Sequence, residues 1–109
     1  MSKCPVYDEA VKYYNALVDE IMSAVDELRR EAKFDPVYLE TRHVVIKKPF
    51  VPDVVIGMLE DRVSVCDCDE GDNFDEIRFD VDKHTVAVIR LWSFEKKGDE
   101  YIEVWLECR

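Results

Sequence analysis

Residues 85–108 read TVAVIRLWSFEKKGDEYIEVWLEC and decide the fold. Apolar residues recur at every second position in both halves of this stretch, and β-branched residues are frequent, which is typical of β-strands. The charged residues EKKGD at positions 95–99 separate the two halves. A connection this short favours an antiparallel hairpin over a parallel crossover. We therefore expect an antiparallel sheet.

The register of the hairpin can be predicted from its side-chain pattern. Pairing Arg90 with Trp105 gives the hairpin one apolar face and one aromatic, charged face. The preceding strand then pairs so that Glu76 lies opposite Arg90. A slip of one residue in either register would mix the two faces. The expected core face carries Ile77, Phe79, Val81, Ala87, Ile89, Leu91, Val104 and Leu106.

The segment from Pro5 to Lys33 predicts a long amphipathic helix. Its apolar residues recur in alternating steps of four and three, the spacing of one helix face. Proline suits the first turn, and the helix dipole favours the acidic residues near the start and the basic residues near the end. Asp35 precedes Pro36, and a residue before proline leaves the helical conformation. We expect the helix to cover one face of the sheet, and its stepping also suits packing against a second copy.

Beyond Pro36 the β-branched residues dominate, so the remainder predicts strands. Pro49 and Pro52 place the residues between them in an extended connector outside any central strand. We expect an α+β fold, with one long N-terminal helix packed on a five- or six-stranded antiparallel sheet, as a single domain over residues 1–109. The expected strands are Val37 to Lys47, Asp53 to Leu59, Arg62 to Cys68, Asp75 to Val81, Thr85 to Phe94 and Glu100 to Cys108.

The composition narrows the class of protein. Of 109 residues, 48% are apolar, and 25 acidic against 15 basic residues give a net charge of −10. This apolar content is too high for a charge-driven disordered chain. The chain contains neither an apolar run of membrane-spanning length nor a signal-peptide pattern, so we expect a cytoplasmic protein without a membrane partner. Glutamine is absent and asparagine occurs only at Asn15 and Asn73, which favours a hyperthermophilic source, such as an archaeon or its mobile element.

One helix layer leaves the second face of the sheet open. Aromatic residues and arginine are enriched in the centres of protein interfaces. We therefore expect a non-enzymatic interaction or accessory protein, most simply a homodimer, with another protein as the alternative partner. Two further possibilities are that the segment from Phe34 to Val51 covers this face and that the register differs. The candidate interface residues are Arg90, Trp92, Phe94, Tyr101 and Trp105, with Arg90 expected over the ring of Trp105.

Nucleic acid is a disfavoured partner. Aromatic rings beside arginine can stack single-stranded bases, but binding of the phosphate backbone requires several basic residues. The expected face instead brings Glu76, Glu103 and Glu107 close to the rings. The acidity also suits an alternative function, an inhibitor whose carboxylates occupy the basic groove of a nucleic-acid enzyme.

The cysteines leave three states open. Cys66 and Cys68 lie on the same side of an expected strand, where a disulfide between them would be strained. Either could pair with Cys4 or Cys108, remain a free thiol, or join a zinc site, which needs four ligands. The sequence predicts no metal ligand and no cofactor.

The acidic stretch from Asp67 to Asp75 could supply oxygen ligands to a cation, but its spacing differs from that of an EF-hand. We expect a solvated loop. The alternative function in the enzyme class is a small metal-assisted hydrolase or nuclease that uses this stretch with Cys66, Cys68 or His84. The sequence predicts no catalytic residue.

Overall fold

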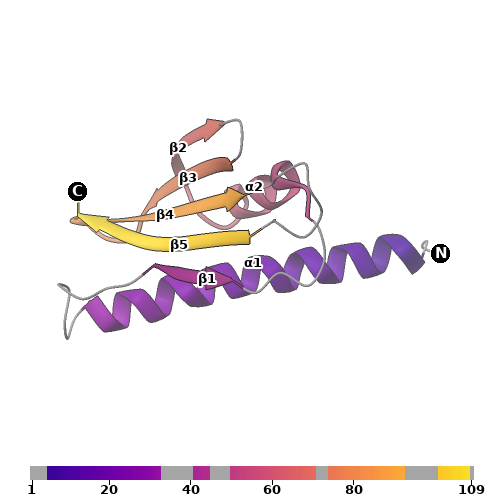
Figure 1. Cartoon of the computed structure of the whole chain (residues 1–109), viewed down its shortest axis with the longest axis horizontal. Helices are drawn as coiled ribbons and strands as arrows, with labels where there is room; N and C mark the ends of the chain where they lie inside the picture. The colour runs from indigo at the N-terminus through magenta and orange to yellow at the C-terminus, as the bar shows by residue number, and fades with distance from the viewer. Residues whose placement is uncertain (1–4, 33–40, 45–49, 71–73, 93–100, 109) are drawn as a thin grey trace.

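The computed structural model describes residues 5–32, 41–44, 50–70, 74–92 and 101–108. These residues form a long helix, a short helix and one antiparallel sheet with the strand order β1-β5-β4-β3-β2. This is the α+β fold expected from the sequence (Figure 1). The elements are α1 (Pro5–Ala32), β1 (Arg42–Val44), α2 (Pro52–Glu60), β2 (Val65–Glu70), β3 (Phe74–Asp80), β4 (Thr85–Trp92) and β5 (Tyr101–Cys108).

Helix α1 follows the predicted boundaries closely. Its 28 residues span about 42 Å at 1.5 Å per residue, whereas an eight-residue strand spans about 27 Å. The helix lies alongside β1 and β5, and its N-terminal part extends beyond the sheet (Figure 1). Arg29 and Arg30 occupy the last turn, where the dipole favours cations. The residues buried against the sheet are Leu17, Val18, Ile21, Val25 and Leu28.

The hydrophobic core lies between the helices and one face of the sheet. The sheet contributes Ile77, Ile89 and Val104 from its three central strands, and α2 adds Val55 and Leu59. The predicted core residues are buried or packed against the core. Those that are buried are Ile77, Phe79, Ala87, Ile89, Leu91 and Val104, and those partly buried against them are Val81 and Leu106.

One of the two predicted registers is confirmed and the other is wrong. Glu76 lies opposite Arg90 between β3 and β4, as predicted. Between β4 and β5, Arg90 lies opposite Glu103 and not opposite Trp105. The shift is two residues, and because strand side chains alternate with a period of two, every residue keeps its predicted face.

The prediction of a strand from Asp53 to Leu59 is wrong, because Pro52–Glu60 forms helix α2. Proline stands in the first turn, where its missing N–H costs nothing, and Asp53 adds a favourable charge there. The buried residues are Val55, Ile56 and Leu59, which share one side of a helix. Packing of this side into the core overrides the strand preference of the β-branched residues.

Two other strands are shorter or displaced. The prediction from Arg62 to Cys68 begins too early, since β2 covers Val65–Glu70. Of the predicted strand from Val37 to Lys47, β1 accounts for Arg42–Val44, and positions 37–40 and 45–47 lie outside the described residues. Neither described helix is both long and apolar enough to span a membrane.

Candidate functional site

The sheet face opposite the core is here called the far face. Alternate residues of β3, β4 and β5 point to this face, and the registers arrange them in rows across the strands. His43 of β1 lies in the second row, opposite Glu103. The first row is Phe74, Trp92 and Tyr101, the second is Glu76, Arg90, Glu103 and His43, and the third is Arg78, Val88 and Trp105.

The first row is a continuous line of rings. Trp92 is flanked on both sides, with the Phe74 ring centroid at 4.6 Å and the Tyr101 ring centroid at 5.4 Å. The planes of Trp92 and Tyr101 differ by only 15°, so these two rings stack on each other. The His43 ring lies 6.2 Å beyond Tyr101. Trp92 and Tyr101 therefore cover each other's faces, whereas the Phe74 ring is tilted by 43° to that of Trp92.

The guanidinium of Arg90 lies over two rings of the far face, those of Phe74 and Trp105. Its guanidinium carbon lies 4.5 Å from the centre of the Phe74 ring and 5.1 Å from that of Trp105. The contact with Trp105 is the predicted cation–π interaction, although Arg90 and Trp105 are diagonal neighbours and not an opposed pair.

Carboxylates hold the arginines and both indoles in place. Arg78 Nε donates to Glu76 Oε2 at 3.1 Å, and Arg90 Nε donates to Glu76 Oε1 at 2.7 Å. Arg78 Nη1 donates to Glu107 Oε1 at 2.8 Å. The indole N–H of Trp105 donates to Glu107 Oε2 at 2.8 Å.

Glu103 holds the other indole. The indole N–H of Trp92 donates to Glu103 Oε1, and His43 Nε2 lies 3.5 Å from Glu103 Oε2. Both tryptophans of the chain are therefore hydrogen-bonded to carboxylates on the same sheet face.

Hydrogen bonding on the far face favours the charged forms of Glu107 and Arg78. The hydrogen bonds from Arg78 and from the Trp105 indole lower the pKa of Glu107. Glu107 and Glu76 raise the pKa of Arg78. Both effects have the same physical cause, since each hydrogen bond favours the charged form of its partner.

The far face has a buried layer of its own. Val88 is fully buried but does not belong to the core beneath the helices. Its neighbours in the row are Arg78 and Trp105, whose side chains flank it on β3 and β5. Only 7% of the surface of Glu76 is exposed to solvent, although this residue lies on the side of the sheet away from the core.

The structure brings four of the five candidate residues together. Arg90, Trp92, Tyr101 and Trp105 all lie on the far face and are all half-buried, whereas Phe94 lies outside the described residues. The sequence reasoning did not single out Phe74, Arg78 or His43 as members of this face. The correct register of Glu76 with Arg90 already places Phe74 opposite Trp92 and Arg78 opposite Val88, so a signal for two of them was present.

The segment expected to cover this face can be placed only in part. Arg42–Val44 adds an edge strand, and Phe50 is buried in the core on the helix side. The rest of the segment from 34 to 49, apart from Thr41, lies outside the described residues.

The candidate metal and thiol residues lie elsewhere. Cys66 and Cys108 are free and exposed, and Cys4 lies outside the described residues. Within the described part of the chain, no group of three or more metal-ligating side chains is close enough to hold an ion. An open depression of about 650 Å³ lies where α2 leads into β2, lined by residues 60–66 and Cys68.

The turn between β3 and β4 places the second histidine. His84 donates its backbone N–H to Asp82 Oδ1 at 2.9 Å, and this hydrogen bond lowers the pKa of Asp82. His84 is therefore a turn residue, as its position after Asp82 and Lys83 predicts.

Comparison of the chain with protein families, with curated proteins and with solved structures finds no match.

Proposed function

We propose that this protein is a non-enzymatic interaction protein that forms a homodimer through the far face. The observation that carries the proposal is the set of half-buried rings, Phe74, Trp92, Tyr101 and Trp105, on the sheet face opposite the core. Large aromatic residues and arginine gathered in the middle of a surface are typical of interface hot spots.

The arrangement of the rings favours a protein over a nucleic acid or a sugar. A stacked base needs an open ring face. The Trp92 ring is flanked on both sides by other rings, and the Trp105 ring is covered by the Arg90 guanidinium. What these rings offer to a partner is their edges, which pack well against other side chains.

Ion pairs in the middle of the far face reduce the repulsion between two copies. The whole chain has a net charge of −10, so two copies repel each other over most of their surface. On the far face, Glu76 and Glu107 are instead matched by Arg78 and Arg90 through hydrogen-bonded ion pairs. These pairs reduce the repulsion between two far faces, although Glu103 and, on β2, Asp69 leave the face with an excess of negative charge.

The size of the far face also suits a second sheet. Five strands of three to eight residues, about 4.8 Å apart, cover roughly 500 Å² before side-chain relief is counted, and a standard interface buries about 800 Å² per partner. A single helix, about 10 Å wide, would cover less than half of this width. A second copy of the same sheet matches it, and two sheets pack face to face about 10 Å apart.

Light scattering coupled to size exclusion tests the proposal. We expect the wild-type chain, of 12.8 kDa, to elute with about twice that mass. Trp105→Asp removes a half-buried ring from the middle of the face and adds a negative charge, and it is expected to give the monomer mass. Tyr101→Lys, which leaves the side chains around Val88 intact, is expected to weaken the dimer as well.

The matched control is Val54→Asp, which introduces the same charge at an exposed position of α2. It is expected to keep the dimer mass. A monomeric wild-type chain at high protein concentration would refute the proposal, and so would a Trp105→Asp variant that folds and keeps the dimer mass. Circular dichroism establishes that each variant is folded.

A further inference from the structure

Strand β2 has an open main-chain edge. It is the last strand of the sheet, and among the described elements it pairs with β3 alone (Figure 1). Its six residues, Val65–Glu70, extend over about 20 Å, with a register shift between Val65 and Asp67 that leaves Asp67–Glu70 as the regular part of the strand. An edge of this kind is a template on which another extended segment can add a strand.

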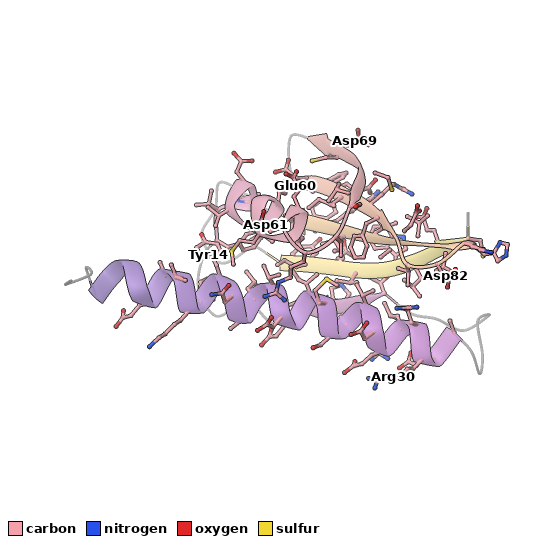
Figure 2. The ribbon with its side chains drawn as sticks, turned by 180° about the vertical axis from the view of Figure 1, so that it is seen from behind. Tyr14, Arg30, Glu60, Asp61, Asp69 and Asp82 are labelled. Carbon is pink, nitrogen blue, oxygen red and sulfur yellow. The ribbon has the colours of Figure 1, made fainter. Side chains whose placement is uncertain are left out.

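The surface beside this edge is hollow and acidic. The open depression of about 650 Å³ extends from the end of α2 to Val65, Cys66 and Cys68 of β2. Figure 2 shows Glu60 and Asp61 at the end of α2 and Asp69 on β2. Arg62 is the basic residue of the lining, and its Nη1 is paired with Asp19 Oδ1 at 2.6 Å.

The charge along this part of the chain determines which occupant fits. Two β2 edges from two copies would place aspartates against aspartates, and like charges opposite each other destabilise a strand pair. A second copy is therefore excluded by repulsion, whereas a basic segment is attracted. The acidic residues from position 60 to position 75 are Glu60, Asp61, Asp67, Asp69, Glu70, Asp72 and Asp75, and the basic residue is Arg62.

We propose that the β2 edge binds an extended segment of another protein in which lysine or arginine alternates with apolar residues. The segment adds to β2 as a further strand of the sheet. Main-chain hydrogen bonds to β2 provide the affinity, and the acidic side chains around Asp69 and Asp61 select the basic partner. The main-chain edge of β2 lies in the plane of the sheet, whereas the second copy packs on the far face, although Asp69 lies opposite Glu76 at the border of that face.

A labelled peptide of about seven alternating lysine and valine residues, long enough to span β2, serves as the probe. Fluorescence anisotropy is expected to give saturable binding of one peptide per chain, stronger at low ionic strength. A peptide of the same sequence with alternate amides N-methylated keeps the charge but cannot pair along that edge, and is expected to bind at least about tenfold more weakly. Equal binding of the two peptides would overturn the proposal.

Two charge-reversal variants locate the site on the protein. Asp61→Lys, at an exposed position in the lining of the depression, is expected to weaken binding about tenfold. Asp26→Lys, at an exposed position of α1, changes the net charge equally and is expected to leave the affinity unchanged. Equal weakening by both variants would show non-specific attraction and contradict the proposal.

Amide chemical shifts identify the edge directly. Addition of the lysine–valine peptide is expected to shift the amide resonances of β2 and of residues 60–64, and not those of β1. Shifts confined to β1 or to the far face would refute the proposal. The Trp105→Asp variant is expected to bind the peptide as the wild type does, so failure of the homodimer and failure of this site are distinguishable.

Discussion

Glu76 is the residue on which the order of the far face depends most. Its two carboxylate oxygens accept one hydrogen bond from Arg78 and one from Arg90, and its side chain is only 9% exposed. Glu76→Ala removes both bonds. A hydrogen bond between charged groups contributes about 1.5–3 kcal/mol, so two would contribute at most about 6 kcal/mol.

The arginines reduce this loss because they are partly solvated. The side chains of Arg78 and Arg90 are 31% and 34% exposed, and water replaces part of what the carboxylate provided. We therefore expect Glu76→Ala to lower the free energy of unfolding by about 3 kcal/mol. In a domain of this size each kcal/mol shifts the melting temperature by about 4–8 °C, which gives a decrease of roughly 12–24 °C.

Urea denaturation followed by tryptophan fluorescence measures this change. Both tryptophans lie on the far face, so the signal reports on the region that is perturbed. The protein concentration is held fixed, because self-association adds to stability. The matched control is Glu103→Ala, which removes the hydrogen bond from the neutral indole of Trp92 and is expected to cost about 1 kcal/mol. A loss from Glu76→Ala no larger than the loss from Glu103→Ala would refute the reasoning.

Three other predictions concern the fold and its pH dependence. Tyr14→Phe removes the hydroxyl that accepts the Val51 N–H at 2.8 Å, and we expect unfolding by urea to show a loss of about 0.5–1 kcal/mol. Ile89→Ala opens a cavity in the fully buried centre of the sheet, and the same measurement is expected to show a loss of about 2–5 kcal/mol, with a smaller loss contradicting its central place. The folded pKa of Glu107 is lowered, chiefly by Arg78, so its stabilisation is present above the unfolded pKa and lost as the pH falls through the folded pKa. Between about pH 7 and about pH 3 the wild type should therefore lose more stability than Glu107→Gln, and an equal loss would contradict this assignment.

The helix and the two faces of the sheet could be predicted because their patterns are periodic and long. The stripe of α1 repeats over 28 residues, and in β5 the apolar residues Ile102, Val104 and Leu106 alternate with residues of the far face. The register between β3 and β4 follows from matching charges and faces, as in the pair of Glu76 with Arg90. Because one face of the sheet is buried under the helices, the pattern within each strand determines which of its residues point to the core.

The register between β4 and β5 could not be predicted by the same criterion. Pairing Arg90 with Trp105 or with Glu103 separates the two faces equally well, because the alternatives differ by two residues. The choice between them depends on contacts across the strands, such as the stacking of Trp92 on Tyr101. Such contacts are properties of the assembled sheet and not of either strand.

Helix α2 was missed for a different reason. Val54, Val55 and Ile56 have a strand preference, and nine residues are too few for a helical period to stand out. The informative residues are Pro52 and Asp53, which suit the first turn of a helix. Burial of Val55 and Leu59 in the core then stabilises the helix over a strand.

The far face loses less side-chain entropy on association because Glu76, Glu103 and Glu107 already hold its arginines and indoles. Long and aromatic side chains that are mobile in a free protein lose rotamer freedom when they enter an interface, at about 0.5–1.5 kcal/mol each. In the single chain, before any association, Arg90 is already hydrogen-bonded to Glu76 and Trp105 to Glu107. Folding has therefore preorganised the surface, and a partner that docks on it meets side chains whose freedom is already restricted.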